Sequence, residues 1–178
     1  MTDATHLPDV HLRGVLADRD AWSAELCSMD RAVQLVGRRS DLLLLREAFY
    51  GSTRFDEFVR RTGLSEPVVA ARLRRLVAAG LLVRVPYREA GERERLGYAL
   101  TPMGDELLGP VVALLRWGDR WLAPDGPPIV LEHSGCGAAV DVTIRCAAGH
   151  TVGAGGIDAR VGPGVDRPHR GRAGPGDS

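Results

Sequence analysis

The 178-residue sequence contains no lysine, so arginine supplies all of its 23 basic side chains. Acidic side chains also number 23, which gives a formal net charge of zero. A neutral chain is at first sight a poor partner for nucleic acid, because affinity for phosphate is built from clustered positive charge. That exclusion holds only if the charges are spread evenly along the chain.

Other features are also scarce. Aromatic residues make up 5% of the chain, there are three cysteines, and no apolar run approaches the roughly 18–20 residues that span a bilayer. The first twenty residues lack the basic and then apolar pattern of a secretory signal, and three cysteines do not describe a secreted disulfide framework. We therefore expect a cytoplasmic protein that does not associate with membranes.

Catalytic signatures are missing as well. The sequence has no glycine-rich phosphate loop, no GxSxG elbow, no HExxH motif and no nucleophile–base or carboxylate pair at motif spacing. We expect a protein that is not an enzyme.

Composition divides the chain into four predicted segments. Residues 1–26 form an N-terminal arm, residues 27–123 a domain dense in periodic apolar residues, and residues 124–160 a glycine-rich, small β-rich extension. Residues 161–178 contain mainly Gly, Pro, Arg and Asp without an apolar pattern, which predicts disorder.

The second segment has a regular order of elements. Helical spacing, capping residues and β-type patterns predict three helices, a fourth after a short turn at 62–64, a β-hairpin and a last helix in whose middle Pro110 would introduce a kink. This order predicts a mainly α fold with a β-hairpin wing, the winged helix-turn-helix, followed by the small β-rich extension. The predicted helices are 30–37 (with Val33 inward), 41–50 (capped by Ser40), 54–61 (followed by a tight turn at Gly63), 65–79 (capped by Ser65) and 101–122 (capped by Thr101), and the strands are 81–86 and 95–100.

The helix 65–79 has the pattern of a recognition helix. Val69, Leu73 and Leu76 share one face, which predicts the core side, and small or arginine side chains lie on or beside the opposite face. Arginine pairs bidentately with guanine or phosphate, and the first helical turn offers unpaired N–H groups to a phosphate. The predicted DNA-binding residues are Arg54, Ser65, Pro67, Val68, Ala71, Arg72, Arg75, Arg88, Arg93 and Arg95.

The charge is not spread evenly. Residues 31–100 contain 14 Arg and 8 acidic residues, a net charge of +6, and the remainder contains 9 Arg and 15 acidic residues, a net charge of −6. The neutral total therefore hides a basic domain with acidic flanks, which favours a nucleic-acid partner.

A series of motifs in this domain resembles the HxlR-type transcriptional regulators of the MarR-like superfamily. The matching segments are Cys27–Val33, Gly37–Glu47, Arg54–Phe58, Arg72–Leu82, Leu100–Leu107 and the pair Trp117-Gly118. The chain departs from the family pattern at Cys27-Ser28 (Cys-Pro in the family), Arg39-Ser40 (Lys-Trp) and Glu66-Pro67 (usually polar).

The resemblance implies a homodimer that binds double-stranded DNA at a palindromic operator and acts as a repressor released by a small molecule or a redox signal. Winged helices also serve as protein–protein interaction modules without operator binding, which is the alternative. The basic helix and hairpin favour DNA.

Two features are candidates for sensing the signal. Cys27 stands where some HxlR-type regulators carry a redox-sensing cysteine, and a nearby helix start and Arg31 would stabilise its thiolate; the alternative is a half-buried cysteine without chemistry. Leu114, Trp117 and Trp121 are candidates to line an effector pocket, with dimer or core packing as the alternative.

A last group of residues lies in the extension. His133, Cys136, Cys146 and His150 have side chains that ligate zinc, arranged as two close pairs separated by nine residues. The sequence leaves three alternatives open: a structural zinc, a Cys136–Cys146 disulfide, or two ordinary thiols. No other cofactor is indicated.

Overall fold

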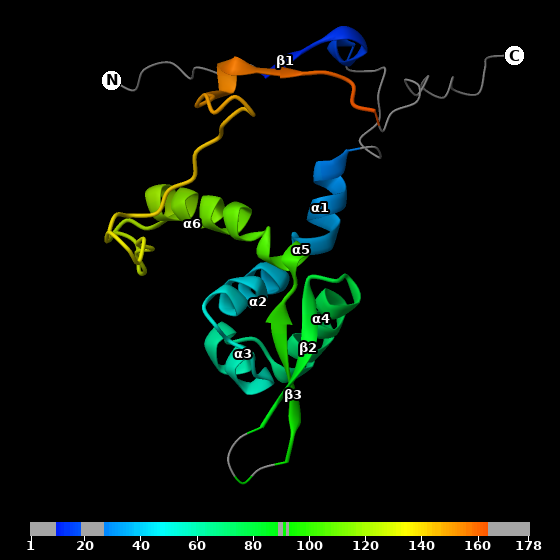
Figure 1. Cartoon of the computed structure of the whole chain (residues 1–178), viewed down its shortest axis with the longest axis vertical. Helices are drawn as coiled ribbons and strands as arrows, with labels where there is room; N and C mark the ends of the chain where they lie inside the picture. Colours follow the sequence, from blue (N-terminus) through cyan, green and yellow to red (C-terminus); the bar gives the residue numbers. More distant parts are fainter. Residues whose placement is uncertain (1–9, 19–26, 89–90, 92, 164–178) are drawn as a thin grey trace, which may run out of the picture. The chain divides into compact units, whose positions relative to one another are not determined.

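The computed structural model describes residues 10–18, 27–88, 91 and 93–163 (Figure 1). It divides into two compact units, one built from the residues up to Arg31 together with those from Thr143 onward, and one from Ala32–Val142. The boundaries predicted after residues 26, 123 and 160 remain a prediction. Trp22, expected as the only large anchor of the N-terminal arm, lies outside the described residues, as do residues 164–178 of the predicted tail.

The first unit contains a short parallel sheet. Strand β1 (Val10–Leu12), followed by the 3-10 helix η1 (Gly14–Ala17), pairs with β4 (Ile157–Ala159), which follows η4 (Ala154–Gly156). Arg13 Nε donates to Asp158 Oδ1 at 2.9 Å beside the pairing. Residues 10–17 of the arm therefore form a strand and a 3-10 helix. The strand partner lies nearly 150 positions away, and local sequence patterns do not reveal so distant a pairing.

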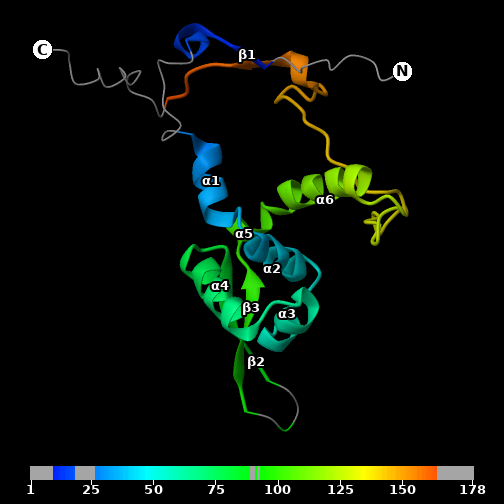
Figure 2. The same cartoon turned by 180° about the vertical axis from the view of Figure 1, so that it is seen from behind.

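The second unit contains the helices and the hairpin in the predicted order. The elements are α1 (Ser28–Val36, which begins in the first unit), α2 (Arg39–Phe49), α3 (Phe55–Thr62), α4 (Glu66–Ala78), β2 (Leu82–Tyr87), β3 (Arg95–Leu100), α5 (Pro102–Asp105) and α6 (Leu108–Leu122). Strands β2 and β3 are antiparallel, with Leu82 opposite Leu100 and Tyr87 opposite Arg95. The hairpin extends beyond α3 and α4 (Figure 1), which both pack against α2 (Figure 2).

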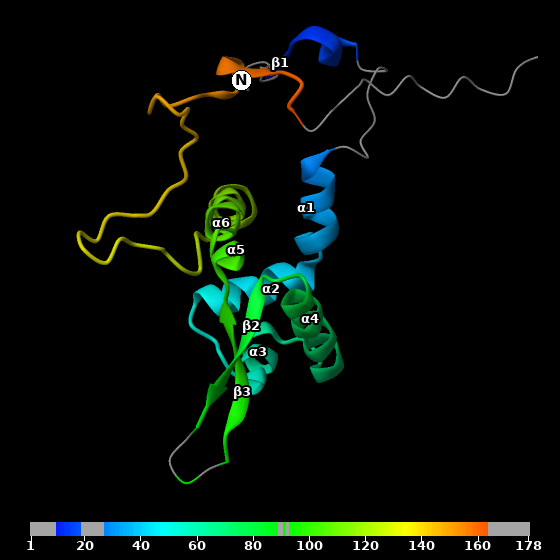
Figure 3. The same ribbon diagram turned by 45° about the vertical axis from the view of Figure 1, so that its right-hand side comes forward.

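Three local predictions were wrong. The single helix predicted over 101–122 is divided into α5 and α6 (Figure 3), with the break at Glu106–Leu107. Pro110 lies in the first turn of α6, where a missing N–H costs no helical hydrogen bond. Helix α2 begins at Arg39, so Ser40 is not its cap. Val33, expected on the core side of α1, is 49% exposed.

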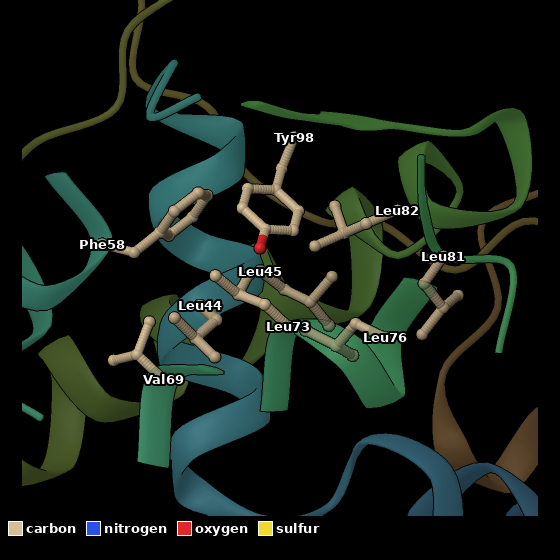
Figure 4. Packing of buried hydrophobic residues seen from close by; sticks show 9 residues of the cluster. All are labelled: Leu44, Leu45, Phe58, Val69, Leu73, Leu76, Leu81, Leu82 and Tyr98. Carbon is tan, nitrogen blue, oxygen red and sulfur yellow. The ribbon is translucent and has the colours of Figure 1, made fainter. Parts of the chain in front are cut away.

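The core lies between α2, α3, α4 and the hairpin (Figure 4). Phe58 and Tyr98 meet edge to face, with ring centroids 6.0 Å apart, and bind α3 to the hairpin. The backbone N–H of Tyr98 donates to Thr53 O at 2.8 Å, and a side chain on the neighbouring Gly97 would collide with that carbonyl. The buried cluster is Leu44, Leu45, Phe58, Val69, Leu73, Leu76, Leu81, Leu82 and Tyr98.

The motif Leu-Thr-x-x-Gly at 100–104 connects the hairpin to the last helices. The Thr101 hydroxyl caps α5 by accepting from Gly104 N at 3.1 Å, and it donates to Gly80 O at 2.5 Å. A Cβ at Gly104 would overlap Leu81 O, the carbonyl that also accepts from Thr101 N at 3.1 Å. The glycine is required because two backbone segments touch at this point.

Candidate nucleic-acid interface

Helices α3 and α4 are joined by a tight turn. Helix α3 ends at Gly63, whose φ of +67° is the left-handed conformation that glycine adopts at little cost, and its N–H donates to Val59 O at 3.1 Å. Thr62 Oγ1 donates to Phe58 O at 2.6 Å and accepts from Leu64 N at 3.3 Å. Ser65 is the N-cap residue of α4, as predicted, although its side chain makes no cap hydrogen bond.

The start of α3 is fixed by Glu57. Its Oε2 accepts from the backbone N–H groups of Thr53 and Arg54, both at 3.0 Å. These two hydrogen bonds are the main cause that lowers the pKa of Glu57 below its ordinary value of 4.5. The carboxylate therefore satisfies N–H groups that the first helical turn cannot.

Helix α4 divides into a buried face and an exposed face. Val69, Leu73 and Leu76 are completely buried, as predicted. The residues that point outward are Pro67, Ala71, Arg74 and Ala78, together with Val68, which is 39% exposed, and Ser65 and Glu66 at the start. The outer face is slim apart from Arg74, and a slim outer face is what a helix needs to enter the major groove.

Arg72 and Arg75, predicted to read DNA, contact the protein itself. Arg75 Nη1 donates to Asp41 Oδ2 at 3.1 Å, and Arg75 Nη2 donates to Gln34 O. Arg72 Nε lies 4.0 Å from Asp41 Oδ1. Their side chains are 25% and 34% exposed, and direct DNA contacts by either one remain a prediction.

Asp41 is a buried carboxyl on α2 that the sequence reading did not identify as important. It is completely buried, and burial raises its pKa above the ordinary 3.8, an effect that the guanidinium groups of Arg72, Arg75 and Arg38 partly oppose. Oδ1 has no hydrogen-bond partner among the described residues. The carboxyl thus holds two arginines of α4 against α2, although its burial away from water opposes the stability of the fold.

Arg74 is the exposed arginine of α4 that sequence reasoning missed. It makes no ion pair within the described part of the chain and lies on the outward face. The signal was present: at 100° per residue Arg74 is turned about 140° from Val69, whereas Arg72 is turned only about 60°. A stricter use of the helical period would have selected Arg74.

The wing adds arginines at the hairpin tip. Arg88, Arg93 and Arg95 are exposed, at or beside the loop where Gly91 turns with a φ of +83°. The Arg54 guanidinium carbon lies 5.2 Å from the centre of the Tyr87 ring, so this predicted DNA-binding residue also supports the hairpin from the start of α3.

The predicted effector residues line two different cavities beside α6. Trp117 and Trp121, 57% and 67% exposed, line a cavity of about 540 Å³ together with Arg116 and Arg120. Leu114 lines a more apolar cavity of about 350 Å³ between α2 and α6. The structure therefore does not bring the three side chains into one pocket.

The predicted redox and zinc-binding residues are placed as follows. Cys27 is half-buried directly before α1. His133 and Cys136 lie close together on one turn, and Cys146 and His150 on another. Within the described ranges no three His, Cys, Asp or Glu side chains form a cluster that could hold a metal.

A tight helix–turn–helix with a slim exposed second helix and an arginine-bearing β-hairpin defines the winged helix-turn-helix class. Residues 35–126 match the model of the HxlR-like helix-turn-helix family, and the chain belongs to this family of transcriptional regulators. The family is not a class of enzymes. No helix in the described ranges is both long and apolar enough to cross a membrane.

Similar proteins carry related descriptions. An uncharacterized HTH-type transcriptional regulator of Mycobacterium tuberculosis (strain ATCC 25618 / H37Rv) is 43% identical over 139 residues, which cover 77% of this chain and 87% of the relative. The crystal structure of the transcription-factor candidate PA1607 is 34% identical, with a TM-score of 0.67 over 77% of this chain and 94% of the other. A second such candidate, PA1374 from Pseudomonas aeruginosa, is 31% identical, with a TM-score of 0.55 over 78% and 94%.

Proposed function

We propose that this regulator binds double-stranded DNA as a homodimer at a palindromic operator and represses transcription until a small molecule or an oxidant releases it. Helix α4 enters the major groove, with its outward face toward the bases, and the wing arginines contact neighbouring phosphates. Arg72 and Arg75 contribute indirectly, because they hold α4 on α2.

The exposed face of α4 is the observation that carries this proposal. Pro67, Ala71 and Ala78 are small enough to approach base edges, and Arg74 is the long donor among them. Arginine pairs bidentately with guanine O6 and N7 or with a phosphate. The acidic parts of the chain lie outside residues 31–100, so the positive charge is concentrated in the domain that carries this face.

Arg74→Ala tests the assignment, with Arg160→Ala as the matched control, since Arg160 is also an exposed arginine but lies outside the winged domain. Fluorescence anisotropy with DNA from upstream of the protein's own gene would give Kd over a series of salt concentrations. We expect Arg74→Ala to raise Kd about tenfold, which corresponds to roughly 1.4 kcal/mol. Arg160→Ala should leave Kd unchanged.

Two results would refute the assignment. If the wild type and Arg74→Ala bound DNA equally well, the outward face of α4 would not be the DNA-contacting surface. Wild-type binding no tighter to the upstream DNA than to random DNA would favour the alternative, a winged-helix protein–protein interaction module. A steep fall of affinity with salt is expected in either arginine variant that still binds, because arginine–phosphate contacts release counterions.

The releasing signal has two candidate receivers. Trp117 and Trp121 line a cavity in which Arg116 and Arg120 stand beside Asp119 and Asp141, which suits a small aromatic ligand that carries polar groups. Cys27 is half-buried directly before α1 and is the second candidate. Mass spectrometry after mild peroxide treatment tests the second candidate: absence of any Cys27 adduct or Cys27-linked dimer would leave the ligand as the signal.

A further inference from the structure

The cavity of about 350 Å³ between α2 and α6 has an apolar wall made by three segments of the chain. Leu42 and Leu43 line it from α2, Val111 and Leu115 from α6, and Pro128 from the segment that follows α6. All three segments belong to the unit Ala32–Val142. A concave apolar site of this volume lies within the range of roughly 300–1,000 Å³ that small-molecule sites occupy.

Gly118 opens the wall of this cavity on the side of α6. It lies inside the helix without a positive φ, and nothing stands within 4 Å of the position that its Cβ would take. Gly104 differs, because a Cβ there would meet a backbone carbonyl. A glycine inside a helix is less favourable than alanine, and at position 118 neither the backbone conformation nor a contact with the described residues requires it. Its missing side chain instead leaves room for an occupant of the cavity.

The two charged residues that border the cavity already have partners of opposite charge. Arg46 Nη2 donates to Glu47 Oε1 at 2.7 Å. Asp119 Oδ2 lies 4.0 Å from Arg116 Nη1. The other lining residues are apolar or glycine. A charged ligand would therefore lose its hydration without meeting an unpaired opposite charge, whereas an apolar ligand would remove carbon surface from water on both sides.

We propose that the cavity between α2 and α6 binds one small, uncharged, apolar molecule per chain. Three wall segments can enclose a small molecule, whereas a helix of a second copy needs a groove that is open along its length. The site is a different cavity from the one beside Trp117 and Trp121. It goes beyond the proposed function, because it does not depend on DNA binding.

The test titrates the full chain with N-phenylnaphthylamine, an uncharged aromatic dye whose fluorescence rises in apolar surroundings. With the wild type the increase should saturate at one dye per chain. Gly118→Leu fills the cavity and should raise the Kd of the dye at least about tenfold. Gly118→Ala adds only a methyl group and should have a smaller effect. The matched control is Gly109→Leu, which also places a leucine in open space on α6 but away from the cavity lining, and it should bind the dye like the wild type.

The chemical class of the ligand is tested with anilinonaphthalene sulfonate, which has the same ring system and one added sulfonate. In the binding that Gly118→Leu removes, the sulfonated dye should be at least about tenfold weaker than the uncharged one, because the sulfonate would be desolvated without an unpaired cation. Equal affinity of the two dyes would overturn the assignment of an uncharged ligand.

Two further results would overturn the proposal. Equal dye binding by the wild type, Gly118→Ala and Gly118→Leu would place the dye elsewhere on the protein. A wild type without a saturable fluorescence increase would leave the cavity without a small-molecule ligand. If Gly118→Leu, but not Gly109→Leu, then also converted a dimer to a monomer in sedimentation velocity, the occupant would be a second copy of the chain.

Discussion

Arg75 on α4 forms a hydrogen-bonded ion pair with the buried Asp41 on α2, in which Arg75 Nη1 donates to Asp41 Oδ2 at 3.1 Å. Its other terminal nitrogen donates to Gln34 O near the end of α1. One guanidinium therefore ties α4 to two other helices, while the next residue toward the N-terminus, Arg74, points to solvent. Adjacent arginines in the helix thus have different physical roles, and these can be separated by experiment.

The first prediction compares Arg75→Ala with Arg74→Ala. Arg75→Ala leaves a buried carboxyl with only the more distant charges of Arg72 and Arg38, and should lower the free energy of unfolding by about 2 kcal/mol. Arg74→Ala should change it by less than about 0.5 kcal/mol. Urea denaturation of both variants measures the difference, and equal stabilities would contradict the pairing seen here.

A second prediction concerns the pH dependence of stability at Asp41. Burial raises the pKa of this carboxyl in the folded state above 3.8. The folded state then holds the proton more tightly than the unfolded state, so the contribution of Asp41 to stability is present below pH 3.8 and is lost as the pH rises through the folded pKa. The variant Asp41→Asn has no titrating carboxyl at this position and therefore lacks this pH-dependent contribution to stability.

Denaturation of the wild type and Asp41→Asn between about pH 4 and 7 checks the sign. The stability of the wild type relative to the variant should fall as the pH rises. If it instead rose over the same interval, the two arginines would outweigh desolvation, and Asp41 would be a carboxylate with a depressed pKa.

The third prediction concerns Glu57, whose contribution to stability changes with pH in the opposite direction to that of Asp41. Hydrogen bonds from Thr53 N and Arg54 N lower its pKa below 4.5, so its contribution to stability is present above pH 4.5 and is lost as the pH falls through the folded pKa. Glu57→Gln should cost about 0.5–1 kcal/mol at pH 7 and should remove this loss in acid. Asp56→Asn is the control: among the described residues this exposed acid pairs only with Arg60, at 3.4 Å, and its replacement should cost less than about 0.5 kcal/mol.

The order of the elements was predictable because the residues that determine each helix or strand lie within that element or next to it in the sequence. The apolar spacing of Val69, Leu73 and Leu76, the glycine at position 63 and the threonine cap at 101 act within a few residues, and the structure confirms all three. The confirmed fold class and family both depend on such local signals.

Contacts between distant residues were not predictable in the same way. The pairing of β1 with β4 joins residues nearly 150 positions apart, and the contact of Arg75 with Asp41 joins residues 34 positions apart. Composition showed that arginines are concentrated in the domain, but not which of them an internal carboxyl would engage. The outward position of Arg74 follows from the helical period, whereas the contact of Arg75 with Asp41 does not follow from any local pattern.

The fourth prediction tests the backbone contact at Gly104. Gly104→Ala should lower the free energy of unfolding by about 2 kcal/mol, because the new methyl group meets the rigid backbone carbonyl of Leu81. Gly109→Ala is the control: it is also a helical glycine, but nothing lies within 4 Å of its Cβ position, so it should be neutral or stabilising by about 0.5–1 kcal/mol. Similar losses in both variants would mean that the cost is not the contact with Leu81.

The last prediction concerns the proposed homodimer. Leu114, Trp117 and Trp121 recur at helical spacing on α6 and are 54%, 57% and 67% exposed, an apolar stripe of the kind that a second copy of the chain covers. Leu114→Glu places a charge in the stripe and should convert the dimer to a monomer in sedimentation velocity at micromolar concentration. Arg120→Glu places the same charge on the same helix about a quarter turn away and should remain dimeric. A dimer that tolerates Leu114→Glu as well would require the two chains to associate through a surface other than this face of α6.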